Sequence, residues 1–185
     1  MEIYFNRVGR LLFVEEMKNK NLLLIVGTGL LWIASRRNKG QMLSKNFSLK
    51  EFTKSATAKR LGIENKPDPI AILNLQALVD NVLQPLRNAM GFPITVTSGY
   101  RSQELNDALN GAYQSQHMKG QAADIVAPPN NAQMFYYIKD NLPFDQLIWE
   151  AGNTQSPEWI HVSYSITNNR KQVLRYIPGQ GYSIF

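Results

Sequence analysis

A long helix over residues 69–90 emerges from the spacing of the hydrophobic positions. Asp68 is a favoured N-cap residue, Pro69 fits the first helical position, and Gly91 closes the helix. Between these ends the apolar residues recur at helical spacing: Leu75, Leu78, Val79, Val82 and Leu86. Pro85 lies inside the pattern, so we expect a kink at that point.

Short segments with the composition of strands follow this helix. They are residues 93–98, 122–127, 146–150, 159–164 and 172–177. A further helix fits residues 130–142, because Pro143 follows its end. A shorter one opens at Ser48, whose spacing to Glu51 is that of a capping box. This order of elements predicts an α+β fold with a small antiparallel sheet flanked by helices.

An uncharged apolar run, residues 21–35, precedes the folded part of the chain. Its fifteen residues would form a helix of about 22 Å, shorter than a hydrocarbon core of about 30 Å. Basic residues bracket the run as interfacial charges would: Lys18, Lys20, Arg36, Arg37 and Lys39. A membrane anchor, a signal-type segment and a buried core helix compete. The anchor is favoured, because no A-x-A cleavage site follows the run. Its orientation stays open.

The chain divides accordingly into four predicted parts. They are a basic extension (1–20), the apolar helix (21–35), a polar linker (36–46) and a folded domain (47–185). Positive charge is concentrated near the N-terminus, since residues 1–60 hold twelve Lys and Arg against four Asp and Glu, and residues 61–185 hold eight against ten. A nucleic-acid-binding domain would carry its basic patch on the folded part. The charge distribution therefore argues against a nucleic-acid partner.

The candidate chemistry involves the two histidines of the chain, His117 and His161. Asp124 follows His117 by seven residues, so the two side chains can converge only if the chain turns between them, and Gly120 offers such a turn. Asp124 lies in an apolar segment, where its carboxylate needs a partner, either a metal ion or an arginine. Two imidazoles and one carboxylate are the protein ligands of a catalytic zinc site. The absence of cysteine excludes thiolate ligands.

Two further residues could act beside such a metal. Glu158 lies three positions before His161, and Pro157 suggests that the strand begins after it, so that the carboxylate can bend toward the histidine as a general base. Without the nearby histidine, Glu158 would be an ordinary solvated charge. Arg101 lies near the start of a predicted helix, where the helix dipole does not favour a cation. Its guanidinium could bind a substrate carboxylate or stabilise an oxyanion.

Three motifs in order, SGYRS, SQHMKGQAAD and EWIHVS, give the chain a resemblance to the zinc D-Ala-D-Ala carboxypeptidase family. That family shares its fold with the vancomycin-resistance dipeptidases and the hedgehog signalling domain. The similarity covers about residues 46–177. It implies one zinc ion bound by His117, Asp124 and His161, Glu158 as the catalytic base, and Arg101 facing the substrate carbonyl or carboxylate. Ser115 and Gln116 are implied as substrate contacts.

The resemblance also implies a substrate, the peptide stem of bacterial peptidoglycan. Both D-Ala-D-Ala carboxypeptidase and L-Ala-D-Glu endopeptidase activity occur among such relatives, so the bond that is cut stays open. With the apolar run as a membrane contact, we expect a membrane-anchored enzyme facing the cell wall, either in a bacterial envelope or in phage lysis or entry. The alternative is a non-catalytic protein that keeps the metal and binds cell wall or serves in a virion.

Overall fold

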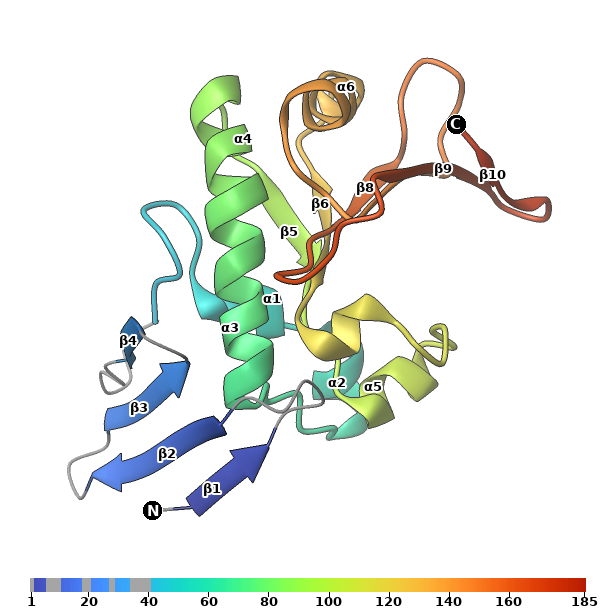
Figure 1. Cartoon of the computed structure of the whole chain (residues 1–185). Coiled ribbons are helices and arrows are strands. Elements are labelled where there is room, and N and C mark those ends of the chain that lie inside the picture. The colour runs from blue at the N-terminus through green and yellow to red at the C-terminus, as the bar shows by residue number, and fades with distance from the viewer. Residues whose placement is uncertain (1, 6–10, 18–20, 27–28, 34–40) are drawn as a thin grey trace. The chain divides into compact units, whose positions relative to one another are not determined.

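The computed structural model describes residues 2–5, 11–17, 21–26, 29–33 and 41–185 (Figure 1). The chain forms two compact units, Met1–Lys39 and Gly40–Phe185, and each is described by itself. Side chains are described from residue 41 onward. The four-part division expected from the sequence stays a prediction.

The first unit is a four-stranded sheet in which each strand pairs antiparallel with the next (Figure 1). Its strands are β1 (Glu2–Phe5), β2 (Leu11–Met17), β3 (Asn21–Val26) and β4 (Gly29–Ile33). The sheet has the order β1-β2-β3-β4.

The apolar helix expected over residues 21–35 is therefore wrong for the residues described. They form β3 and β4, which pair from Leu22 with Ile33 to Val26 with Gly29. The physical reason lies in the glycines at 27 and 29, because each glycine inside a helix costs about 1 kcal/mol relative to alanine. Among the residues that the structure describes, no helix is both long and apolar enough to cross a membrane. The expected membrane contact through a helix at this position has no support.

The second unit begins with short helices and one long helix. Helix α1 (Leu49–Thr53) opens with the predicted capping box, in which the Ser48 backbone N–H donates to a Glu51 carboxylate oxygen at 2.7 Å. Helix α2 (Ala56–Leu61) follows. The long helix consists of α3 (Pro69–Leu78), the π-helical turn η1 (Val79–Leu83) and α4 (Gln84–Met90). Asp68 caps it, because its carboxylate accepts from the Ala71 N–H at 2.7 Å.

The π-helical turn η1 accommodates the proline inside the long helix. Pro85 lacks an N–H, and its ring crowds the carbonyl four residues earlier. The wider turn relieves this, since the Gln84 N–H donates to the Val79 carbonyl five residues back. The apolar positions predicted for this helix are all fully buried: Leu75, Leu78, Val79, Val82 and Leu86.

Six strands form the sheet of the second unit, in the order β10-β9-β7-β8-β6-β5. They are β5 (Thr95–Ser98), β6 (Ala122–Val126), β7 (Gln146–Glu150), β8 (Trp159–Ser163), β9 (Gln172–Ile177) and β10 (Gly181–Ile184). The five predicted strands are confirmed, and β10 is an addition. Neighbouring strands are antiparallel except β7 and β9, which pair parallel, while β8 lies on the other side of β7.

Alternation along the central strands gives the sheet two different faces. One face packs into the core beneath α4 and α6 (Asn131–Asn141) through Ala123, Ile125, Leu147, Trp149, Ile160 and Val162. The residues between these point to the opposite face: Asp124, Ile148, Glu150, Trp159 and His161. Helix α5 (Gln103–Ala108) and the 3₁₀ turn η2 (Gln116–Lys119) precede β6 (Figure 1). The predicted α+β class is thus confirmed, and the polar face carries the site.

Candidate active site

Strand pairing places two of the expected metal ligands side by side. Asp124 of β6 lies directly opposite His161 of β8, and His161 lies opposite Ile148 of β7. Residues that face each other across antiparallel strands point to the same side, with Cβ atoms about 5 Å apart. Register alone therefore brings the carboxylate and one imidazole together.

A tight turn brings in the third ligand. His117 lies in η2, and Gly120 ends this turn in the left-handed conformation, with φ of 68°. A Cβ at Gly120 would lie 2.3 Å from the carbonyl oxygen of Ala71, so a side chain has no room there. The chain reverses at this glycine and enters β6, which allows His117 and Asp124 to converge as predicted.

The three ligand atoms form a compact triangle. His117 Nε2 lies 3.2 Å from His161 Nδ1 and 3.3 Å from Asp124 Oδ1, and the remaining side measures 3.0 Å. Tetrahedral zinc with bonds of about 2.0–2.2 Å holds its ligand atoms about 3.4 Å apart. All three residues are buried. The spacing and the donor set therefore fit one zinc ion.

A second hydrogen bond fixes the orientation of His117. Its Nδ1 lies 2.7 Å from the carbonyl oxygen of Gly99, so this nitrogen carries the proton and Nε2 presents its lone pair to the triangle. Gly99 is required for this approach, because a Cβ there would lie 2.6 Å from the backbone of Phe52. The glycine of the SGYRS motif thus supports a metal ligand.

Arg101 completes the surroundings of Asp124. One guanidinium nitrogen, Nη2, donates to Asp124 Oδ2 at 2.8 Å, and Nε donates to Ser98 Oγ at 3.0 Å. Burial raises the pKa of Asp124, but its close contacts with His117 and His161 outweigh burial and hold that pKa well below its usual value. Asp124 is therefore ionised, as a metal ligand must be.

The triangle opens onto a cavity of about 490 Å³. Besides the three ligands, the lining includes Arg101, Ser115, Gln116, Glu150, Trp159, Arg170, Tyr176 and Tyr182. The structure thus brings Arg101, Ser115 and Gln116 to the same cavity as the ligands, where a substrate could contact them. The Gln116 amide also donates to the Asp145 carboxylate at 2.9 Å.

Glu150, which the sequence motifs did not single out, is a second carboxylate at this cavity besides Asp124. It is 8% exposed at the end of β7, opposite Trp159 and two residues beyond Ile148, the neighbour of His161. Burial raises its pKa, and the charge of Asp124 adds to that rise against the opposing effects of His161 and Arg101. The sequence did contain a signal, because alternation in QLIWE puts a glutamate on the face opposite the core.

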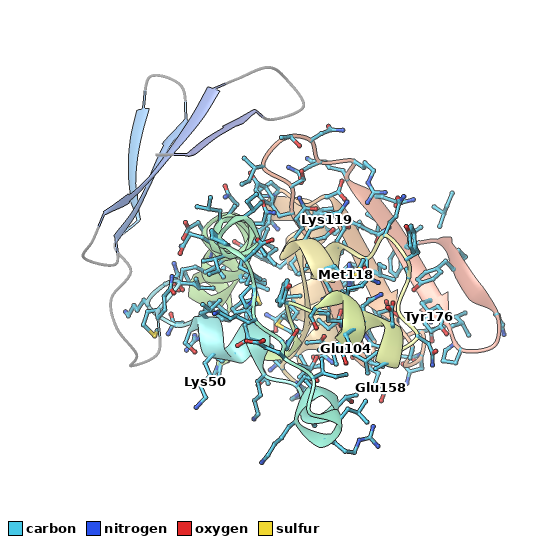
Figure 2. All side chains as sticks on the ribbon, turned by 90° about the horizontal axis from the view of Figure 1, so that it is seen from below. Lys50, Glu104, Met118, Lys119, Glu158 and Tyr176 are labelled. Atoms are coloured by element: carbon cyan, nitrogen blue, oxygen red, sulfur yellow. The ribbon has the colours of Figure 1, made fainter. Side chains whose placement is uncertain are left out.

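Glu158 lies outside the lining of this cavity. Its side chain is exposed just before β8 (Figure 2). Its backbone N–H donates to the Glu150 carbonyl at 3.0 Å, so the two glutamates come from adjoining chain segments. The role of Glu158 as catalytic base stays a prediction.

Two histidines and one aspartate form the triangle, and a cavity lies at its open side. This arrangement is typical of mononuclear zinc hydrolases. The family model of Peptidase M15 matches residues 45–163, and the chain belongs to this family. This confirms the resemblance drawn from the three sequence motifs. Arg170, Tyr176 and Tyr182 line the cavity from beyond the matched residues.

One curated relative is the zinc D-Ala-D-Ala carboxypeptidase of Streptomyces albus G. It is 52% identical over 46 residues, which cover 24% of this chain and 18% of the relative. The alignment thus spans less than a fifth of that protein's length. Together with the His–Asp–His group, the family and this relative confirm a single zinc ion as the metal that fits the site.

Proposed function

We propose that this protein is a zinc peptidase that hydrolyses the peptide stems of bacterial peptidoglycan. The observation that carries the proposal is the buried triangle of His117, Asp124 and His161, open to a cavity that also contains Glu150. A zinc ion at the triangle would supply Lewis acidity and lower the pKa of a water molecule. Membership in Peptidase M15 and the relative from Streptomyces albus G support a stem-peptide substrate.

Glu150 is our candidate for the general base. Its buried carboxyl group has a raised pKa, which suits a group that takes a proton from the attacking water and delivers it to the leaving amine. It lies two residues along β7 from Ile148, which pairs with the metal ligand His161, and this keeps it near the reacting atoms. Glu158, from the ExxH spacing of the sequence, is the alternative base.

Arg101 has two tasks in this mechanism. Its bond to Asp124 Oδ2 directs the other carboxylate oxygen, Oδ1, toward the two histidines. Its remaining N–H groups line the cavity, where they can stabilise negative charge developing on the substrate carbonyl oxygen. Ser115 and Gln116, from the same wall of the cavity, are available to hold the substrate backbone.

The test uses the full chain. Its metal content is determined first, and the protein is then incubated with purified peptidoglycan with and without a chelator. Mass spectrometry of the released fragments should show new peptide ends that the chelator abolishes. Loss of D-Ala would identify a carboxypeptidase, and new D-Glu amino ends would identify an endopeptidase. Bound zinc without new ends would favour the non-catalytic cell-wall-binding role, and no bound metal would contradict both.

A stem-peptide substrate implies a location with access to the cell wall. We propose action at the bacterial envelope or in phage lysis or entry, two settings that share this substrate. Membrane association through residues 21–35 stays a prediction. Fractionation of cells that produce the full chain, with and without a high-salt wash, would measure it.

A further inference from the structure

Arg170 is a second guanidinium at the cavity, in the connection between β8 and β9. It lies beyond residues 45–163, so the family match does not extend to it. Within the part of the chain that the structure describes, the positively charged residues that line the cavity are Arg101 and Arg170. Their side chains are 17% and 51% exposed, respectively. Arg170 is therefore the more accessible cation.

A buried carboxylate holds Arg170 in place. The Asp145 side chain, 4% exposed, accepts from Arg170 Nε at 2.9 Å, from Nη2, and from the Arg170 backbone N–H at 2.9 Å. Gln116, next to the metal ligand His117, donates to the same carboxylate. These hydrogen bonds lower the pKa of Asp145, so the pair is ionised and rigid.

The contact with Asp145 uses one edge of the Arg170 guanidinium and leaves a second edge available for another partner. Nε and Nη2 face Asp145, so the N–H groups of Nη1 and the second N–H of Nη2 are directed elsewhere. These form the kind of paired donor edge that binds a carboxylate through two parallel hydrogen bonds. Arg101 has the same two nitrogens engaged, by Ser98 and Asp124, but its side chain is more deeply covered than that of Arg170.

The positions along β7 indicate how far Arg170 and its partner Asp145 lie from the metal ligands. Asp145 precedes β7, and Ile148, three residues later, pairs with His161. Three strand residues span about 10 Å, which is the reach of two or three residues of an extended peptide. Glu150 lies two residues beyond Ile148, on the other side. The metal ligands thus lie between a carboxylate at one end and a guanidinium at the other.

We propose that Arg170, held by Asp145, binds a carboxylate of the substrate two to three residues from the bond that is cut. This inference rests on the proposed function, since it assigns part of the substrate to part of the same cavity. A peptidoglycan stem offers two such groups, the α-carboxylate of D-Glu and the C-terminal carboxylate of D-Ala. Both have the chemistry that the free edge of Arg170 recognises.

The experiment measures binding separately from turnover. The zinc-loaded Glu150→Gln protein is titrated calorimetrically with the synthetic pentapeptide L-Ala-γ-D-Glu-L-Lys-D-Ala-D-Ala. Two further peptides carry an amide in place of one carboxylate each. Each titration is repeated in the Arg170→Gln and Arg170→Lys backgrounds, and mass spectrometry verifies that the peptide is intact. Lys171→Gln is the matched control, because it removes a neighbouring positive charge whose side chain is exposed and does not line the cavity.

One amidation should weaken binding roughly 10- to 100-fold when Arg170 is present, the range of a charge-assisted hydrogen bond. The amidation that weakens binding identifies the substrate carboxylate that Arg170 binds. In Arg170→Gln the free and amidated peptides should bind equally, Arg170→Lys should restore part of the preference, and Lys171→Gln should keep it. A merely structural role for Arg170 would weaken all three peptides alike.

The inference is overturned if neither amidation matters, if the preference survives Arg170→Gln, or if no peptide binds. Should Arg170→Gln fail to fold, the preference of Glu150→Gln with Arg170 intact and that of Arg170→Lys still decide, because lysine keeps the charge and loses the paired donor edge. Activity is measured in parallel on the wild-type protein. If cleavage is the same for the free and the amidated peptides, the inference about Arg170 is wrong and the peptidase function stands. If binding depends on the carboxylate but no cleavage occurs, the peptidase function is wrong and the carboxylate site stands.

Discussion

At the scale of single residues, the environment of a carboxylate decides what it can do. Glu150 and Glu158 are linked by a backbone hydrogen bond, but one side chain is buried beside the metal ligands and the other is exposed. Burial raises the pKa of Glu150, and this favours proton transfer near neutral pH. Sequence spacing favours Glu158, whereas geometry favours Glu150.

Replacing each glutamate by glutamine separates these assignments. Glu150→Gln should lower kcat by about 10²–10⁴-fold, the usual contribution of a general base. Glu158→Gln should retain activity near that of the wild type. The measurement is kcat on stem peptides together with the zinc content of each variant.

Zinc content is the control, since both variants should keep one equivalent of metal. If Glu158→Gln is the inactive variant, the base is Glu158 and the assignment from burial fails. Loss of zinc from Glu150→Gln would make Glu150 a support of the metal site rather than a base.

At the scale of elements, the turn between η2 and β6 determines whether the ligands meet. Gly120 has a positive φ, and a Cβ there would collide with the backbone of α3 at Ala71. Helix α3 thus limits the space available to the turn that carries His117. This contact ties the metal site to the long helix.

Gly120→Ala should therefore lower the free energy of unfolding by more than the 1–2 kcal/mol or so of left-handed backbone strain, and it should weaken zinc binding. Gly62→Ala is the matched control. Its φ of 70° is nearly the same, but no atom lies within 4 Å of the added Cβ. Urea unfolding and zinc titration measure both effects. If both variants lose the same free energy of unfolding, the contact with Ala71 is relieved without displacing His117.

Other features of the elements follow from the sequence directly. The N-cap at Asp68, the capping box at Ser48 and the alternation in the central strands all depend on neighbours within a few residues. Such local patterns predicted α1, α5, α6, the long helix and five of the six strands of the second unit, but not α2. They did not predict that β9 pairs parallel with β7, because pairing partners are selected by the order of the whole sheet.

At the scale of the whole molecule, the metal site joins segments that are far apart in the chain. His117 comes from η2, Asp124 from β6 and His161 from β8, so a bound metal stabilises the folded arrangement of all three. A ligand that binds the folded state alone at 100 times its Kd stabilises that state by about 2.7 kcal/mol.

Zinc should accordingly raise the Tm of the full chain by roughly 5–10 °C at such a concentration, and a chelator should reverse the rise. Thermal unfolding followed by circular dichroism measures the shift. His161→Ala should show no response to zinc, because one side of the triangle is gone. A wild-type Tm that ignores both zinc and chelator would contradict the metal site.

The amino-acid sequence alone predicted the α+β class, most elements of the second unit and the candidate metal ligands His117, Asp124 and His161. Capping, alternation and a glycine turn are local in origin and therefore visible in the chain. The tertiary structure decided which glutamate enters the cavity, because alternation along β7 sets the face of Glu150 but not the neighbours that it meets on that face. It also formed the Asp145–Arg170 pair. These outcomes depend on contacts between distant residues, which no local pattern specifies.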